Sequence, residues 1–280
     1  MNPVLSSQQA AVILEARKNN RQTALVSLDL GLTQSDVHLN SSWVSFPDGQ
    51  RLDWLSLQSV QQSENGCFLI TDHKSQPIQF YSELTDRFYS LCPTTGAPTM
   101  LVSGIPMHRL KDTEPHQDTI EKIRSIKPVV GRVLDTATGL GYTAQLAAKT
   151  ASHVVTIELD PAAIQVARLN PWSQTLFNNP KITQIIGDSF TMVVDFDGNS
   201  FSRIIHDPPA FSLAGDLYST EFYQQLFRVL RNNGRLYHYV GDPHSKSGHN
   251  ITSGVIRRLK QAGFRQVRSA PKAFGVIADK

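Results

Sequence analysis

The sequence predicts an α/β protein in which a small β-rich module precedes a doubly wound, mostly parallel sheet that ends in an antiparallel hairpin. From Arg132 onward, short apolar runs alternate with segments of helical periodicity, which is typical of βαβ units. Acidic side chains end several of these apolar runs, where ligands bind in open α/β sheets. Before residue 104 the apolar runs are short and turn residues separate them, which indicates a different kind of module.

The N-terminal module begins with a predicted helix that Ser6 or Ser7 caps and that continues to Lys18. Short runs rich in β-forming residues then predict strands, and turn signals such as Pro47-Asp48-Gly49 separate them. The expected strands are Ala24–Leu28, Val37–Leu39, Trp43–Phe46, Cys67–Thr71, Ile78–Tyr81 and Met100–Val102. We expect this module to cover the binding cleft or to recognise the substrate.

A helix from about Glu114 to Ile126 is predicted to lead into the second domain, so the expected domains are residues 1–112 and 113–280. The predicted strands are Arg132–Asp135, His153–Glu158, Thr183–Ile186, Arg203–His206, Arg235–Val240, Arg265–Arg268 and Phe274–Ala278. The predicted helices are Tyr142–Lys149, Pro161–Leu169, Ser219–Arg231 and Thr252–Ala262. Because only residues 270–273 link the last two strands, we expect them to form an antiparallel hairpin.

Composition excludes several classes of protein. Hydrophobic residues make up 40% of the 280 residues and charged residues 18%, as in globular proteins with a buried core. The formal net charge of +3 is too small to indicate nucleic-acid binding by itself. Two cysteines cannot form a disulfide framework, and no apolar run is long enough for a membrane span. The first twenty residues lack a signal peptide's apolar core, so we expect a cytoplasmic protein with no membrane partner and no metal site.

The candidate ligand site lies where the predicted strands end. Asp135 is followed by Gly139 and Gly141 before a helix, and glycines there let the backbone approach a ligand beside the free N–H groups of the helix. Glu158 ends the next strand, where a carboxylate can accept hydrogen bonds from a ribose diol. Asp188 follows the third strand and is expected to face an adenine edge, and Asp207 opens the segment Asp207-Pro208-Pro209-Ala210-Phe211.

This pattern resembles the class I methyltransferases that use S-adenosylmethionine (SAM), over residues 131–280. The resemblance implies SAM as the cofactor, with Asp135, Gly139, Gly141, Glu158 and Asp188 holding it. It also implies that Asp207, Pro208 and Phe211 line the acceptor side. Ala137 departs from a family glycine, and Ala210 stands where amino-group methyltransferases of the nucleic-acid type usually have an aromatic residue. The first hypothesis is therefore methyl transfer to an unidentified acceptor, a small molecule or an RNA.

A second resemblance leads to an alternative. The stretch from Leu217 to Leu230, with Asn233-Gly234 after it, is similar to a helix of the spermidine synthases, which put a small β module first and use decarboxylated SAM. Their glycine-rich motif has more glycines and their fourth motif is not Asp-Pro-Pro. The whole chain resembles a group of predicted prokaryotic methyltransferases that share the Asp-Pro-Pro-x-Phe-Ser segment. Aminopropyl transfer, RNA methylation and non-catalytic SAM binding stay open as alternatives, and so does a homo-oligomer.

Several other features have ordinary structural explanations. His206 and His238 end predicted neighbouring strands, so each is a candidate base or orienting donor, but buried histidines are more often simply hydrogen-bonded. The polar segment from Gly241 to His249 is predicted to be a loop, either a lid or a plain surface loop. Six basic residues between Arg257 and Lys272 suit a solvated surface better than a phosphate site.

Overall fold

The computed structural model describes residues 2–210, 214–242 and 245–280, and it divides into two compact units. One unit contains Met1–His116 together with Ala162–Gln174, and the other contains Gln117–Pro161 together with Thr175–Lys280. Each unit is described by itself. The domain boundary after residue 112 stays a prediction.

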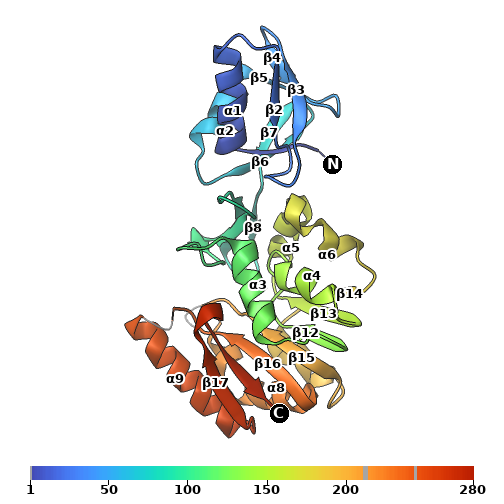
Figure 1. Ribbon diagram of the computed structural model, residues 1–280, viewed down its shortest axis with the longest axis vertical. Helices are drawn as coiled ribbons and strands as arrows, with labels where there is room; N and C mark the ends of the chain where they lie inside the picture. The colour runs from blue at the N-terminus through green and yellow to red at the C-terminus, as the bar shows by residue number, and fades with distance from the viewer. Residues whose placement is uncertain (1, 211–213, 243–244) are drawn as a thin grey trace. The chain divides into compact units, whose positions relative to one another are not determined.

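The strands of the first unit form three small antiparallel sheets (Figure 1). One contains β1 (Val4–Ser6), β6 (Cys67–Thr71) and β7 (Lys74–Pro77). The second contains β2 (Thr23–Val26), β3 (Ser35–Leu39), β4 (Trp43–Ser45) and β5 (Arg51–Asp53). The third is a meander of β8 (Gln79–Ser82), β9 (Arg87–Cys92), β10 (Thr99–Val102) and β11 (Ile105–Pro106). The β-rich character of this module confirms the expectation.

Two helices complete the core of the first unit. α1 (Ser7–Lys18) begins with a capping box. The Ser6 hydroxyl accepts a hydrogen bond from a backbone N–H of the first turn, and the Gln9 side chain accepts one from the N–H of Ser6. α2 (Trp54–Gln62) was not expected from the sequence. It forms because Asp53 caps it and because Trp54, Leu57 and Val60 all face inward. The two helices pack on each other, and their apolar side chains join those of the first two sheets in one core.

The second unit contains a seven-stranded sheet in the order β14-β13-β12-β15-β16-β18-β17. The parallel strands are β12 (Arg132–Asp135), β13 (His153–Glu158), β14 (Ile182–Ile186), β15 (Phe201–His206) and β16 (Leu230–Tyr239). β17 (Gln266–Ala270) and β18 (Gly275–Asp279) form the terminal hairpin, and β18 lies antiparallel to both neighbours. The prediction of a doubly wound sheet with a terminal antiparallel hairpin is confirmed.

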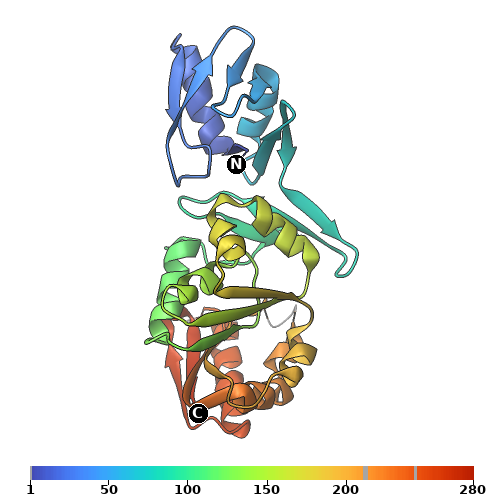
Figure 2. The same ribbon diagram turned by 90° about the vertical axis from the view of Figure 1, so that its right-hand side faces the viewer.

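Helices cover both faces of this sheet. The helices of this unit are α3 (Pro115–Ser125), α4 (Tyr142–Ala148), α6 (Gln174–Asn178), α7 (Ser189–Met192), α8 (Thr220–Val229) and α9 (Lys246–Gln261), whereas α5 (Pro161–Leu169) belongs almost wholly to the first unit. α3 and α8 lie on opposite sides of the sheet (Figures 1 and 2). α4 packs on β12 and β13, whereas α8 and α9 pack on each other and on the sheet's C-terminal strands. A hydrophobic core of this unit lies between these last helices and the sheet.

Several predicted element boundaries in this unit are wrong. The helix expected to run to Arg231 ends at Val229, because β16 begins at Leu230. The last long helix begins at Lys246 rather than Thr252, because the Ser245 hydroxyl accepts a hydrogen bond from the N–H of Gly248 and caps it. The segment from Gly241 to His249 is therefore not one continuous loop. No helix of the part of the chain that the structure describes is long and apolar enough to cross a membrane.

Candidate active site

The carboxyl ends of the parallel strands form one edge of the sheet, and the predicted acids lie there. β12 is central: Asp135 pairs in register with Thr156 of β13 on one side and with Ile205 of β15 on the other. Glu158 ends β13, and Asp207 follows the last residue of β15 directly. Because parallel strands end at the same edge, the structure brings Asp135, Glu158 and Asp207 together at the place where such folds bind ligands.

The side chain of Asp135 is fully buried, and only one of its two carboxylate oxygens accepts hydrogen bonds from described residues. Its Oδ2 accepts hydrogen bonds from the hydroxyls of Thr143 (2.9 Å) and Thr156 (3.1 Å). Its Oδ1 has no hydrogen-bond partner among the described residues. Burial raises the pKa of this carboxyl to about 7, the two threonine hydroxyls oppose the rise, and the charge of Asp207 adds to it. A buried acceptor without a partner costs free energy, which a ligand that donates a hydrogen bond can recover.

The two glycines after Asp135 have different structural roles. Gly139 has φ +52°, and a side chain added there would meet nothing within 4 Å. Gly141 has φ +76°, and a Cβ there would lie 2.5 Å from a methyl carbon of Leu176. Positive φ favours glycine at both positions. Gly141 is therefore needed for packing at the start of α4, whereas Gly139 leaves open space in front of the backbone that a ligand can occupy.

Glu158 is half-buried and connects β13 to the glycine loop. Its Oε2 accepts a hydrogen bond from the N–H of Gly139 (2.8 Å), and its Oε1 accepts one from the N–H of Asp160 (3.1 Å). Burial raises the pKa of this carboxyl, while these backbone donors lower it. Each carboxylate oxygen can accept more than one hydrogen bond, so Glu158 can hold the loop and still accept from a diol.

Asp188 is exposed and has a structural task of its own. Its Oδ1 accepts a hydrogen bond from the N–H of Phe190 (2.9 Å), which caps the short helix α7. It follows β14, whose last residue, Ile186, pairs with Glu158. Asp188 is therefore beside Glu158 on the strand-end edge, and its contact with an adenine edge stays a prediction.

Asp207 belongs to a buried ion-pair network that the sequence did not reveal. Its Oδ2 accepts a hydrogen bond from Lys122 Nζ at 2.7 Å, and the same Nζ lies 3.0 Å from Oδ2 of Asp118. Burial raises the pKa of Asp207, and the Lys122 ammonium opposes that rise. Desolvation acts to lower the pKa of Lys122, but Asp207 and Asp118 together raise it above the ordinary value. Lys122 is therefore a charged ammonium between two carboxylates.

The two prolines after Asp207 form a braced segment. Pro208 is buried, and the carbonyl of Pro209 accepts a hydrogen bond from the hydroxyl of Tyr218 (3.0 Å). Burial raises the pKa of Tyr218, and the nearby charge of Asp207 adds to the effect, so the phenol is a neutral donor. The backbone after Asp207 is therefore held by the two proline rings, which fix its φ angles, and by the hydrogen bond from Tyr218. Phe211, predicted on the acceptor side, lies outside the described residues.

His206 and His238 are not candidates for the base. Both are fully buried, and their ring centroids lie 4.3 Å apart. Nε2 of His206 faces the carbonyl of Leu217 (2.9 Å) and therefore donates, so Nδ1 accepts from the hydroxyl of Thr136 (2.7 Å). His238 Nε2 lies 2.7 Å from the hydroxyl of Tyr223. Burial lowers the pKa of His206 to about 3 and that of His238 well below 6.5, so both are neutral structural residues.

These neutral histidines predict a pH-dependent contribution to stability. A histidine whose folded pKa lies below its unfolded value of about 6.5 loses its stabilising contribution as the pH falls below 6.5, because the unfolded chain binds the proton. Asp135, whose folded pKa is raised, acts in the opposite direction, so the variant must be compared with the parent at each pH. The stability loss caused by His206→Gln should be about 1 kcal/mol smaller at pH 5.5 than at pH 7, as measured by urea unfolding.

The exposed His38 supplies the control for this comparison. The loss caused by His38→Gln should be small at both pH values, because its side chain is exposed. A His206→Gln loss that is as large at pH 5.5 as at pH 7 would show that His206 titrates in the folded protein as it does in the unfolded chain.

Sequence reasoning missed four residues of this site. Thr143 and Thr156 bind Asp135, Lys122 binds Asp207, and Asp118 pairs with Lys122. The i, i+4 spacing of Asp118 and Lys122 in a predicted helix was visible, but such a pair is usually a solvated surface ion pair. Only the packing of α3 against the sheet places the pair beside Asp207.

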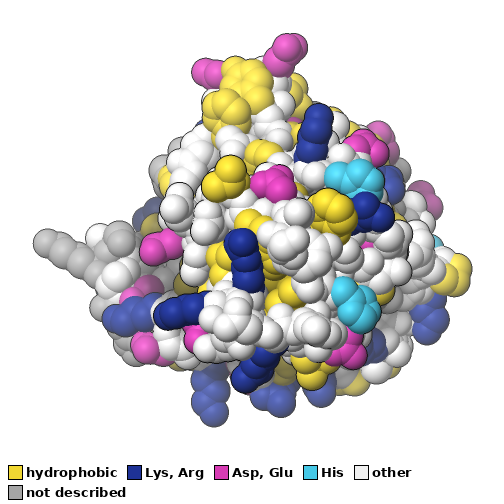
Figure 3. All heavy atoms as spheres, turned by 90° about the horizontal axis from the view of Figure 1, so that it is seen from above, with side chains coloured by type: hydrophobic (Ala, Val, Ile, Leu, Met, Phe, Trp, Pro, Cys, Tyr) yellow, Lys and Arg dark blue, Asp and Glu magenta, His cyan; other side chains and the backbone are white. Residues whose placement is uncertain are grey.

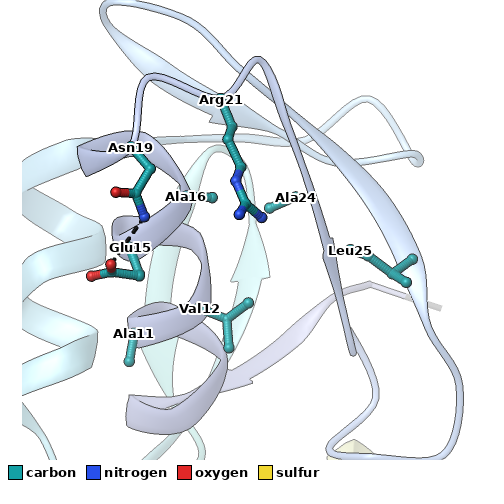
Figure 4. A pocket seen from close by; sticks show the side chains of 8 residues that line it. All are labelled: Ala11, Val12, Glu15, Ala16, Asn19, Arg21, Ala24 and Leu25. Atoms are coloured by element: carbon teal, nitrogen blue, oxygen red, sulfur yellow. Dashed lines mark hydrogen bonds between the residues drawn. The ribbon is translucent and has the colours of Figure 1, made fainter.

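Other parts of the described surface have fewer features of a ligand site than the strand-end edge. A groove of about 480 Å³ in the first unit lies between α1 and β2 (Figure 4), but Glu15 and Arg21 are its only ionisable lining residues, and Glu15 is bonded to Asn19. On the face shown in Figure 3, Lys and Arg side chains are scattered among acidic and hydrophobic ones. No group of three His, Cys, Asp or Glu side chains that could hold a metal occurs among the described residues.

Comparison with known proteins places this edge in context. Residues 140–271 match the family model of the spermine/spermidine synthase domain, and this segment includes Gly141, Glu158, Asp188 and Asp207. The chain is also 37% identical over 283 residues to "Uncharacterized protein MJ1233" of Methanocaldococcus jannaschii, in a match that covers 99% of this chain and 95% of the relative.

Shorter matches point the same way. A polyamine aminopropyltransferase of Mycobacterium tuberculosis is 31% identical over 138 residues, which cover 47% of this chain and 26% of that protein. The chain therefore matches only about a quarter of that relative's length. The structure of spermidine synthase from Thermotoga maritima superposes with a TM-score of 0.57 at 19% identity, over 72% of this chain and 70% of that one. This likeness shows the fold alone.

These findings overturn the first functional hypothesis. Methyl transfer to an unidentified acceptor was inferred from motifs that are shared across the fold class, and shared motifs at strand ends reflect the binding of a nucleoside more than the group that is transferred. The matching family model and the aminopropyltransferase relatives instead favour the alternative that came from the stretch Leu217 to Leu230. RNA methylation is set aside with the main hypothesis.

Proposed function

The chain belongs to the same family as MJ1233 of Methanocaldococcus jannaschii, and from its site we propose that it transfers an aminopropyl group from decarboxylated SAM to an amine. The observation that carries the proposal is the match of residues 140–271 to the spermine/spermidine synthase domain, because that segment contains Glu158, Asp188 and Asp207 of the strand-end edge. Glu158 and Asp188 were assigned to SAM in the sequence analysis, and decarboxylated SAM has the same adenosine and sulfonium.

The charge balance of the site supports this choice of substrates. Asp118, Asp135, Glu158 and Asp207 supply four carboxyl groups, and Lys122 supplies one ammonium. Both proposed substrates are cations: one has a sulfonium and an ammonium, and the other is an aliphatic amine. A partly buried site rich in carboxylates attracts cations and repels phosphate groups, since charge interactions are strong at low dielectric.

The nucleoside half of the site fits decarboxylated SAM. Glu158 is placed to accept hydrogen bonds from the ribose diol, and the open space in front of Gly139 leaves room for the ligand. Asp135 Oδ1 offers a buried acceptor without a partner among the described residues, which suits a donor on the substrate. Asp188 would lie on the adenine side. These assignments are proposals that follow from the position of each residue on the edge.

The reaction is a displacement at carbon. The acceptor nitrogen attacks the aminopropyl methylene carbon that is bonded to sulfur. A C–N bond forms while this C–S bond breaks, and the electron pair of the C–S bond goes to sulfur. The leaving group is neutral 5′-methylthioadenosine, and the nitrogen loses one proton. Asp207, on the exposed side of its ion pair, is proposed to hold the amine in line and to accept that proton. Positioning and a proton acceptor are the two contributions the protein must supply.

The experiment that tests this function is a direct product assay. The purified protein is mixed with decarboxylated SAM and putrescine, and 5′-methylthioadenosine and the aminopropylated amine are measured by mass spectrometry. Both products should form in equal amounts, and SAM in place of its decarboxylated form should give neither. If SAM is consumed with methylation of an amine, while decarboxylated SAM is not used, the proposal is wrong.

A further inference from the structure

We propose that Lys122 is the positioning residue of the acceptor side: by holding Oδ2 of Asp207, it directs the carboxylate so that its other oxygen meets the attacking amine. The inference rests on the proposed function, which assigns Asp207 to the acceptor. It adds a residue of α3, which lies outside the matched segment of residues 140–271. It starts from one contact, the hydrogen bond of 2.7 Å between Lys122 Nζ and Asp207 Oδ2.

Exposure along the network indicates which end meets a ligand. The side chain of Asp118 is 0% exposed, that of Lys122 2% and that of Asp207 18%. Asp207 is thus the member that a substrate can reach, and the other two lie behind it. A network with one accessible carboxylate and a buried cation behind it is arranged to fix that carboxylate.

The groups around Asp207 show why a cation is needed there. α3 contributes Asp118 and Lys122, β12 contributes Asp135, and Tyr218 contributes a neutral phenol. Lys122 Nζ lies 4.8 Å from the ring centroid of Tyr239, which also favours a cation at this place. Without Lys122, Asp207 would be a poorly solvated carboxylate beside two other acids, and its proton would be lost only at a higher pH.

A second contact also anchors α3. The guanidinium of Arg203 in β15 donates through Nε to the carbonyl of Ile126 at 2.8 Å, and this contact holds the end of α3 against the sheet. A lysine that served only to hold the helix would not need a partly exposed partner. The contact with Asp207 is therefore explained better by a role at the site.

Three variants separate positioning from folding. Lys122→Met removes the ammonium. Asp118→Asn with Lys122→Met also removes one carboxylate, so the net charge of the network stays as in the parent and a misfolded single variant does not end the test. Asp118→Asn alone keeps the pair of Lys122 with Asp207. Lys149→Met, on the exposed surface of the same unit, is the matched control for loss of a lysine charge.

Steady-state rates with decarboxylated SAM and putrescine are measured from pH 5.5 to 9. Lys122→Met and the double variant should lower kcat about 10- to 30-fold at pH 7, shift the acid limb of the kcat profile up by at least one pH unit, and leave KM for decarboxylated SAM within about threefold. Lys149→Met should stay within about threefold of the parent, and Asp118→Asn should not shift the acid limb up, because the Asp118 carboxylate acts to raise the pKa of Asp207. Equal losses in Asp118→Asn and Lys122→Met, or an unshifted acid limb in the double variant, would overturn the proposal.

A second readout does not depend on turnover. With ¹³C-labelled aspartate carboxyls, the signal of Asp207, assigned by its loss in Asp207→Asn, reports the protonation of this group directly. Its titration should move up by more than one pH unit in Lys122→Met and in the double variant, but not in Lys149→Met. If the parent lacks aminopropyl transfer but this shift is seen, the proposed function fails and the coupling stands. If the titration does not move, the inference about Lys122 fails whatever the activity.

Discussion

Replacing Asp207 with asparagine is expected to reduce aminopropyl transfer roughly 10²- to 10⁴-fold, the usual contribution of a general base. The exchange keeps the size of the side chain and an oxygen for Lys122 Nζ, which now lies 2.7 Å from Oδ2, but removes the negative charge. Lys122 would keep Asp118 as an ion-pair partner, so the fold should survive. Turnover at saturating decarboxylated SAM, measured by 5′-methylthioadenosine release, is the readout.

Nucleoside affinity should hardly change in the same variant, because Asp207 is proposed to contact the acceptor rather than the adenosine. Calorimetric titration with 5′-methylthioadenosine measures it. Asp195→Asn, an exposed acid of the same unit, is the control for loss of one negative charge. Turnover equal to that of the parent in Asp207→Asn would mean that the segment from Asp207 to Pro209 is structural and that the acceptor meets other residues.

Replacing Glu158 with alanine should weaken nucleoside binding roughly 100-fold or more. Two hydrogen bonds from a ribose diol to a carboxylate contribute about 1.5–3 kcal/mol each, and both would be lost. The variant also removes the acceptors of the N–H groups of Gly139 and Asp160, so the glycine loop loses a tether. The measurement is again calorimetry with 5′-methylthioadenosine.

Two further variants make the Glu158 result interpretable. Asp197→Ala removes an exposed charge from the same unit and should leave affinity unchanged. Glu158→Gln retains one acceptor oxygen, so its affinity should lie between those of the parent and the alanine variant. An alanine variant that is folded and binds 5′-methylthioadenosine as tightly as the parent does would remove Glu158 from the ribose site.

The pair of predictions divides the strand-end edge into two halves. Loss of Glu158 should weaken binding of the nucleoside, and turnover should fall only because less ligand is bound. Loss of Asp207 should lower turnover while nucleoside binding is preserved. This division follows from the strand order: Glu158 ends β13 and Asp207 follows β15, and β12 with Asp135 lies between them. A ligand that spans the edge would meet each acid with a different part of its structure.

Much of the second unit could be predicted from the sequence. Parallel strands buried on both faces read as apolar runs, so β12, β13 and β15 were visible, and the short link at residues 270–273 implied the hairpin. The first unit was harder. α2 and several short strands, β9 among them, were missed. A short amphipathic segment such as Trp54–Gln62 has too few apolar positions to distinguish a helix from other structures.

The functional hypothesis failed for a related reason. Asp135, Glu158 and Asp188 are proposed to form a site for the nucleoside, and the same arrangement serves proteins that transfer different groups from sulfur. The segment that distinguished the alternatives was the stretch Leu217 to Leu230, whose similarity to spermidine synthases was noticed but weighed below the methyltransferase motifs. The family match over residues 140–271 reversed that weighting.

The sequence by itself determined which acids end the strands, because a run of apolar residues, its last carboxylate and the following glycines are all local features. Only the tertiary structure decided what each acid contacts. Lys122 and Asp207 are 85 residues apart, and burial turned a commonplace i, i+4 pair of α3 into a cation behind the acceptor-side carboxylate. The same burial made His206 and His238 neutral, since desolvation depends on what packs around a side chain and not on its neighbours in the chain.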